Sequence, residues 1–155
     1  QGSQFDATGN LQNWWTEADK KAYEARTGLV VKQFDGYQAF PDASINGKLT
    51  LGENIADLTG LTIAWRAYRA SLGGKEAPVI DGLTGDQRFF IGFAQANRAS
   101  MRDETLRSML VSDPHSPARY RVLGVLRNFA PFYAAFDVKE GDGMYLPPEQ
   151  RVEIW

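Results

Sequence analysis

The stretch that decides the fold of this chain is residues 51–72, which read LGENIADLTGLTIAWRAYRASL. Two glycines follow it, Gly73 and Gly74, and glycine at such a position is typical of the end of a helix. We therefore expect a helix from about Gly52 to Leu72. At about 100° per residue, one mostly apolar stripe of this helix should face a core; it comprises Leu51, Ile55, Leu58, Thr62 and Trp65.

Two carboxylates, Glu53 and Asp57, lie four residues apart on roughly the opposite side of this helix. Their neighbours on that side are small: Ala56, Gly60, Ala64 and Ala67. Small residues allow another backbone to come close, so the pattern predicts a helix that is packed on both sides. Like charges at this spacing cost roughly a few tenths of a kcal/mol in water and far more when desolvated. A buried pair therefore requires a cation, which is a metal ion, an arginine or a histidine.

A simpler interpretation of Glu53 is a helix cap. Thr50 and Glu53 match the capping box, in which the glutamate accepts a hydrogen bond from the threonine amide. This pattern is far commoner than a metal site, so spacing alone favours the cap.

His115 is the only histidine of the chain. It lies between Pro114 and Pro117, just before an expected helix that Ser116 would cap. The helix dipole favours a neutral imidazole there, which leaves a directed N–H donor. A single loop histidine is nevertheless more often an ordinary surface residue, so both interpretations stay open.

Three arginines lie on that expected helix. Arg121 shares a face with Gly124, three residues on, so its guanidinium is expected along a closely packed groove. Arg119 and Arg127 lie on other faces and are expected to be surface cations.

Start and stop signals elsewhere predict a mainly α fold of about five or six helices with little strand. One further helix is expected at about Thr16–Tyr37, where Gly28 could break it. A second should run from Thr84 through Ala94 and begin with a capping box of Thr84 and Gln87. The others are expected at about Arg102–Leu110, Pro117–Asn128 and Ala130–Phe136. Pro41–Gly47 should be a loop and Lys48–Thr50 a short extended segment. Trp14 and Trp15 are compatible with a sugar platform, although adjacent aromatics at a helix start more often pack under the core.

Composition limits the class of protein. The chain has 155 residues, 17 basic and 19 acidic, with a net charge of −2 and 43% hydrophobic residues, which fits one domain or one continuous piece of a larger one. Its basic residues are scattered, which disfavours nucleic acid and anionic lipid, and no apolar run approaches the ~20 residues of a membrane helix. With no cysteine and one histidine, the chain cannot build a thiolate metal site or a two-histidine site. It begins at Gln1 without a signal-peptide pattern, which indicates a processed, cut or subcloned chain.

Residues 51–57 also resemble the Gly-Glu-Asn-Ile-Ala-Asp signature of the neprilysin-type zinc metallopeptidases, family M13, which includes endothelin-converting enzymes and bacterial oligoendopeptidases. Other stretches resemble the same family in the same order: Gln4-Phe5-Asp6 through Gly9-Asn10-Leu11 to Trp14-Trp15, Gln33-Phe34-Asp35, Asn46-Gly47, Asp113-Pro114-His115-Ser116-Pro117 with Arg121-Val122, and Trp155. Because the resemblance covers nearly the whole chain, it favours a site at Glu53 over a cap.

The resemblance implies a gluzincin (thermolysin-like) catalytic domain, of which residues 1–155 form a single C-terminal segment. It implies that Zn²⁺ is held by two histidines of a His-Glu-x-x-His helix and by Glu53 as the third protein ligand. Asp57 would then orient a zinc-bound histidine. His115 would stabilise the oxyanion of the tetrahedral intermediate, and Arg121 would bind a substrate carbonyl and pair with Asp57.

The His-Glu-x-x-His helix itself is absent from this sequence. The chain alone is therefore not expected to hydrolyse peptides, and its expected partner is the missing N-terminal segment, lost or present as a separate chain. Together they would form a zinc endopeptidase that cleaves oligopeptides on the amino side of hydrophobic residues. The absence of the disulfides of animal members favours a bacterial source, with a periplasmic or secreted location.

A second class of function stays open, namely a non-catalytic helical module that keeps the peptidase scaffold to bind a peptide or a protein. Zinc binding after addition of a His-Glu-x-x-His segment distinguishes the two.

Overall fold

The structure is a computed structural model that describes residues 2–154. Six α-helices dominate this range: α1 (Glu17–Asp35), α2 (Leu51–Ser71), α3 (Gly85–Ala96), α4 (Asp103–Ser112), α5 (Ala118–Leu126) and α6 (Ala130–Phe136). Two short strands, β1 (Gln38–Phe40) and β2 (Ala43–Ser44), form an antiparallel pair, and single 3-10 turns lie at Gly2–Gln4 and Pro148–Gln150. The predicted mainly α class with little strand is confirmed.

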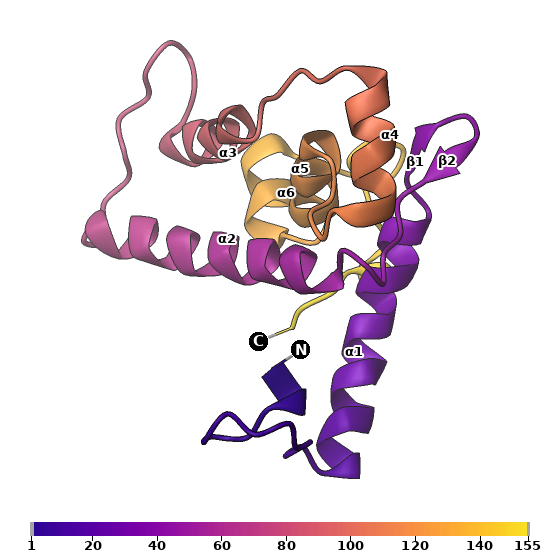
Figure 1. The fold of residues 1–155 in the computed structure, drawn as a ribbon. Coiled ribbons are helices and arrows are strands. Elements are labelled where there is room, and N and C mark those ends of the chain that lie inside the picture. Colours follow the sequence, from indigo (N-terminus) through magenta and orange to yellow (C-terminus); the bar gives the residue numbers. More distant parts are fainter. Residues whose placement is uncertain (1, 155) are drawn as a thin grey trace.

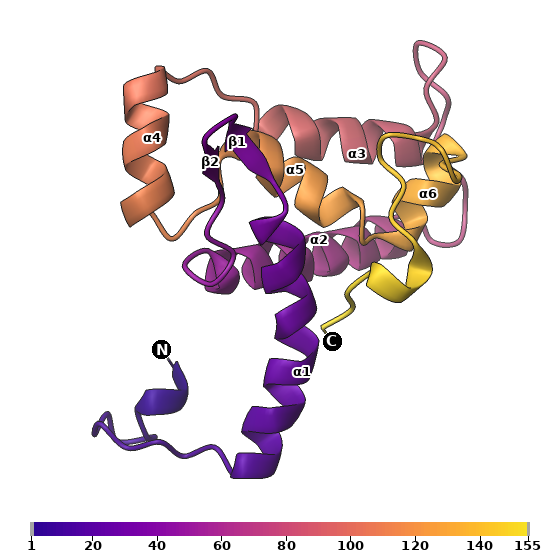
Figure 2. The same ribbon diagram turned by 90° about the vertical axis from the view of Figure 1, so that its right-hand side faces the viewer.

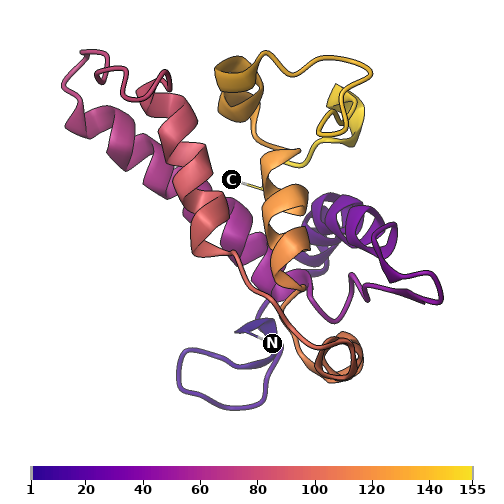
Figure 3. The ribbon, with the colours of Figure 1, turned by 90° about the horizontal axis from the view of Figure 1, so that it is seen from above.

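The other helices and the hairpin are arranged around helix α2. Helices α5 and α6 lie along one side of it with α3 beside them, and α1 runs steeply across its N-terminal end (Figure 1). The β1–β2 hairpin and α4 lie together at that same end, as the turned view shows (Figure 2). From above, α2 and α3 run side by side while α4 stands apart (Figure 3). The N-terminal turn of α2 is therefore the place where several segments distant in sequence meet.

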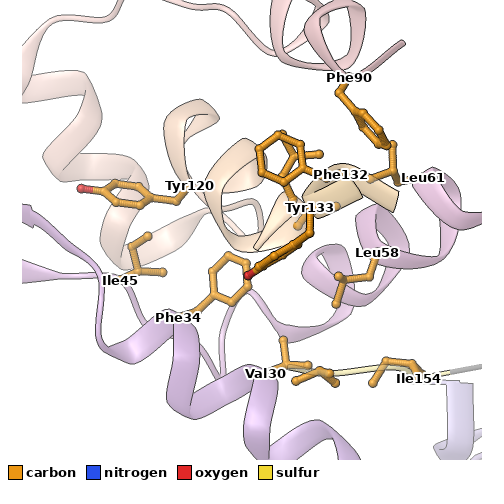
Figure 4. Close-up of a cluster of buried hydrophobic side chains, with 13 residues drawn as sticks. Val30, Phe34, Ile45, Leu58, Leu61, Phe90, Tyr120, Phe132, Tyr133 and Ile154 are labelled. Atoms are coloured by element: carbon orange, nitrogen blue, oxygen red, sulfur yellow. The ribbon is translucent and has the colours of Figure 1, made fainter. Parts of the chain in front are cut away.

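The main hydrophobic core joins α1, α2, α3, α5 and α6 (Figure 4). Its buried side chains include Val30, Phe34, Ile45, Leu58, Leu61, Phe90, Tyr120, Val125, Leu126, Phe132, Tyr133, Val152 and Ile154. The predicted stripe on α2 is partly confirmed, because Leu58 is buried and Leu51, Ile55 and Trp65 pack against the core. Asn54 and Leu61 are buried as well, which the predicted stripe did not include.

Helix α5 approaches α1 through a glycine. Gly124 is buried, and a methyl group added there would fall on the ring of Phe34, which is itself fully buried. The α5 backbone therefore rests directly on an aromatic ring of α1. This contact sets how closely α5, the helix that carries Arg121, approaches α1.

Local capping signals predicted the helices well. The predicted capping box of Thr84 with Gln87 is formed, and α6 has the predicted bounds. Thr16 caps α1 and forms a box with Asp19 that the sequence analysis did not name. Gly28 does not break α1, because tertiary packing of its neighbours in the core outweighs its weak helix propensity.

Several local expectations are wrong. Pro41–Gly47 is not entirely a loop, because β2 lies within it and pairs with β1. Lys48–Thr50 is a turn rather than extended, because Thr50 and Leu49 bond back to Asn46. Ser116 does not cap α5, whose N-cap is Pro117, because the serine hydroxyl bonds elsewhere. The small residues of α2 are exposed within the described part of the chain, so that face is not packed here; they are Ala56, Gly60, Ala64 and Ala67.

Candidate active site

Glu53 lies in the first turn of α2 but does not cap it. Thr50 makes no side-chain capping bond, and its backbone amide and its hydroxyl both donate to the carbonyl of Asn46, each at 3.1 Å. The capping-box interpretation of Glu53 is therefore wrong, and the carboxylate is free to act outside its own helix.

The carboxylate of Glu53 faces the loop that carries His115. Glu53 Oε2 lies 3.1 Å from His115 Nε2, and the two side chains are 39% and 44% exposed. The loop follows α4 and ends where α5 begins, so the histidine reaches back across the fold to the start of α2. The structure thus brings together two residues that lie 62 positions apart in the sequence.

Asp113 fixes the other side of the imidazole, a role that the sequence analysis missed. Its Oδ1 lies 2.8 Å from His115 Nδ1 and accepts a second hydrogen bond, also 2.8 Å, from the His115 backbone amide. The backbone N–H of His115, followed by its ring, lowers the pKa of Asp113 below the ordinary value. An aspartate two residues before a histidine was the available signal, because this spacing allows the aspartate to bond to the backbone that follows it.

Both ring nitrogens of His115 therefore face carboxylate oxygens, which only accept hydrogen bonds when ionised. Asp113 holds the ring through Nδ1, and Nε2 faces the carboxylate of Glu53.

Asp57, one turn after Glu53, forms a bidentate ion pair with Arg121 of α5. Nε of the arginine donates to Oδ2 at 2.7 Å and Nη2 donates to Oδ1 at 2.6 Å. The side chains are 16% and 30% exposed, and the bonds to Asp57 raise the pKa of Arg121 against the opposing effect of burial. This fork geometry is the strong form of a charge-assisted pair, and the predicted pairing of the two residues is confirmed.

The two carboxylates are thus compensated differently. Asp57 has both oxygens engaged by one guanidinium, whereas Glu53 has one oxygen beside an imidazole. Within residues 2–154, no group of three or more histidine, cysteine, aspartate or glutamate side chains could hold a metal ion. A metal ion bound by Glu53 would therefore need further ligands from outside these residues.

The other candidate residues do not belong to this site. Arg119 is exposed, as expected, but Arg127 is half-buried and donates to the carbonyl of Tyr145 at 2.8 Å, so it is not a surface cation. Trp15 packs edge-on against Tyr23 of α1 rather than under the main core, and Trp14 is largely exposed. Across the described residues, no helix is both long and apolar enough to cross a bilayer.

Comparison with known proteins identifies the family. The family model for peptidase family M13 matches residues 1–152. The chain belongs to this family. It is 39% identical over 158 residues to endothelin-converting enzyme 1 of Cavia porcellus, covering all of this chain and 21% of that protein, and 41% identical to neprilysin-1 of Caenorhabditis elegans, covering 99% and 21%.

Solved M13 structures share the fold. The zinc metalloprotease Zmp1 of Mycobacterium tuberculosis, in complex with an inhibitor, superposes with a TM-score of 0.90 at 46% identity, covering all of this chain and 24% of that one. PepO of Lactobacillus rhamnosis gives a TM-score of 0.79 at 38% identity, covering 99% and 23%. The chain thus spans about a fifth to a quarter of the length of these M13 proteins.

Proposed function

We propose that this M13 chain supplies the third zinc ligand, Glu53, and the transition-state donors of a zinc endopeptidase. The observation that carries the proposal is the convergence on one turn of α2, where Glu53 meets His115 and Asp57 meets Arg121. Four side chains from two segments more than 60 residues apart in sequence thereby form two adjacent pairs. Family membership supports the same site.

Glu53 holds the metal through its carboxylate. When bound, Zn²⁺ supplies Lewis-acid polarisation of the scissile carbonyl and a water of lowered pKa. Asp57 acts one turn further along the helix. Each of its oxygens keeps a lone pair beyond the bond to Arg121, which suffices to orient the N–H of a histidine ligand from another segment.

His115 donates from Nε2 to the oxyanion that develops on the substrate. Asp113 holds the ring through Nδ1, so the donor is positioned before the reaction begins. Arg121 aligns the peptide: Asp57 takes its Nε and Nη2, and the N–H groups of Nη1 are available to a substrate carbonyl.

The partner in this proposal is a His-Glu-x-x-His segment, joined to this chain or separate from it. The exposed small-residue face of α2 offers such a segment a close approach. Residues 1–155 act as a single segment of the catalytic domain, inactive alone, and the substrate is an oligopeptide cleaved before a hydrophobic residue. We also propose a bacterial source, which the absence of cysteine and the 46% identity to the mycobacterial enzyme support.

Co-expression with a His-Glu-x-x-His segment tests the proposal. The assembly should retain one zinc ion and show peptidase activity that a chelator removes. A helical module that only binds peptides would gain neither the metal nor the activity.

A further inference from the structure

A buried hydrogen bond joins the two halves of the site immediately behind the reactive side chains. Asn54 follows Glu53 and Ser116 follows His115, and the two side chains are 1% and 2% exposed. Ser116 Oγ lies 2.7 Å from Asn54 Oδ1, across 62 residues of sequence. Asn54 Nδ2 donates in turn to Thr50 Oγ1 at 2.9 Å.

The direction of this chain of hydrogen bonds is fixed by the number of protons. The single hydroxyl proton of Thr50 goes to the carbonyl of Asn46, so Thr50 Oγ1 can only accept from Asn54. The amide nitrogen of Asn54 must then face Thr50, and its oxygen must face Ser116. Ser116 is consequently the donor of the bond that crosses from the loop to α2.

The loop that carries His115 is thus anchored on both sides of the histidine. Asp113 holds the backbone amide of His115, and Ser116 is tied to the first turn of α2. Pro117, which is buried, follows directly and restricts the backbone further. Neither Asn54 nor Ser116 has the exposure needed to touch a substrate.

We propose that the Asn54–Ser116 hydrogen bond is a positioning device that sets where His115 Nε2 stands relative to Glu53. This inference rests on the proposed function, because it assigns the bond a purpose only if His115 acts as the oxyanion donor. An apolar contact would also hold the loop against α2, but it would let the loop slide. A directional bond between buried groups defines one position, and small displacements of a catalytic group are costly to rate.

The experiment uses the enzyme assembled from this chain and a His-Glu-x-x-His segment. Ser116→Ala should lower kcat about tenfold, which is less than the about 10²-fold cost of removing an oxyanion donor. KM should stay within about twofold and the zinc content should not change, because α2 holds Glu53 independently of the loop. Ser116→Cys is a near-isosteric change to a weak donor, so its kcat should lie between those of Ser116→Ala and the wild type. This variant tests the inference if the alanine variant fails to fold.

Two controls separate positioning from a merely structural role. Thr27→Ala removes another buried hydroxyl, whose bond to the Tyr23 carbonyl lies within α1 and away from the site, and it should leave kcat unchanged. In a His115→Ala background, Ser116→Ala should cause no further loss of kcat, since the bond then has nothing to position.

Additive losses in the double variant, or a kcat of the Ser116→Ala enzyme equal to that of the wild type, would overturn the inference. The proposed function fails on a different result. If His115→Ala itself keeps wild-type turnover, the oxyanion role of His115 is wrong, whatever Ser116 does.

Discussion

Replacing Gly124 by alanine should destabilise the protein, although alanine is the better helix former. Gly124 lies inside α5, where alanine gains about 1 kcal/mol over glycine. Against this gain, three ring atoms of Phe34 would lie within 3.0 Å of the added carbon, and both residues are buried. Overpacking of this kind costs about 1–3 kcal/mol.

The surroundings of Gly124 place the cost in the upper part of that range. Gln33 and Asn128 both donate to the Gly124 carbonyl, and Asn128 also donates to Gln33, so α5 cannot easily back away from α1. The expected net loss in the free energy of unfolding is therefore about 1–2 kcal/mol. Because α5 also carries Arg121, we expect peptidase activity to fall with stability.

Gly92→Ala is the matched control. Gly92 lies inside α3, is exposed, and has no atom within 4 Å of the added carbon, so alanine should stabilise by about 1 kcal/mol. Urea denaturation of the two variants in the same assembled enzyme measures both effects. The reasoning is refuted if Gly124→Ala shifts the transition in the same direction as Gly92→Ala.

The remaining predictions concern the site. Glu53→Gln should abolish zinc retention, and Asp57→Asn should lower zinc affinity about 10- to 100-fold, as the loss of a group that orients a metal ligand does. Metal analysis after dialysis measures both effects. Equal zinc affinity in the two variants and the wild type would contradict the assigned roles. His115→Ala should lower kcat by ~10² or more while zinc is retained, and loss of zinc in this variant would instead place His115 among the ligands. The pKa of Asp113 is lowered in the folded state by the His115 amide and ring, so its contribution to stability should be present above its ordinary value of 3.8 and be lost as pH falls through the depressed value. Acid unfolding of Asp113→Asn should lack that part of the pH dependence. Identical acid unfolding profiles for the variant and the wild type would mean that the bonds between Asp113 and His115 do not contribute to stability.

Local signals were sufficient for much of the helical structure because they act within one turn. The box at Thr84 is formed where the sequence predicted it, and Thr16 begins its helix as predicted. Thr50 and Glu53 match the same pattern but do not form the box, since the Thr50 hydroxyl belongs to the buried bonds that reach Ser116. Spacing alone cannot distinguish these cases, because it does not show that the hydroxyl of Thr50 is already engaged by Asn46 and Asn54.

The site was less accessible to sequence reasoning than the helices. Spacing placed Glu53 and Asp57 near each other and required a cation, but it could not say which cation serves which carboxylate. The pairing of Asp57 with Arg121 came from the family resemblance and is seen in the structure. The role of Asp113 depends on the shape of the loop around His115, which no periodicity describes.

The different partners of the two carboxylates give a chemical reason for their different proposed roles. A metal ion competes poorly for a carboxylate whose two oxygens already accept short bonds from one guanidinium, as those of Asp57 do. Glu53 has an imidazole near one oxygen only, is more exposed, and is released from capping its own helix. Removing Arg121 should therefore make Asp57 a competing ligand: Arg121→Ala should lose substrate alignment while it retains zinc, and a variant that also carries Glu53→Gln should recover part of the zinc binding that Glu53→Gln alone has lost. No recovery in that double variant would mean that position along α2, rather than the guanidinium, decides which carboxylate binds the metal.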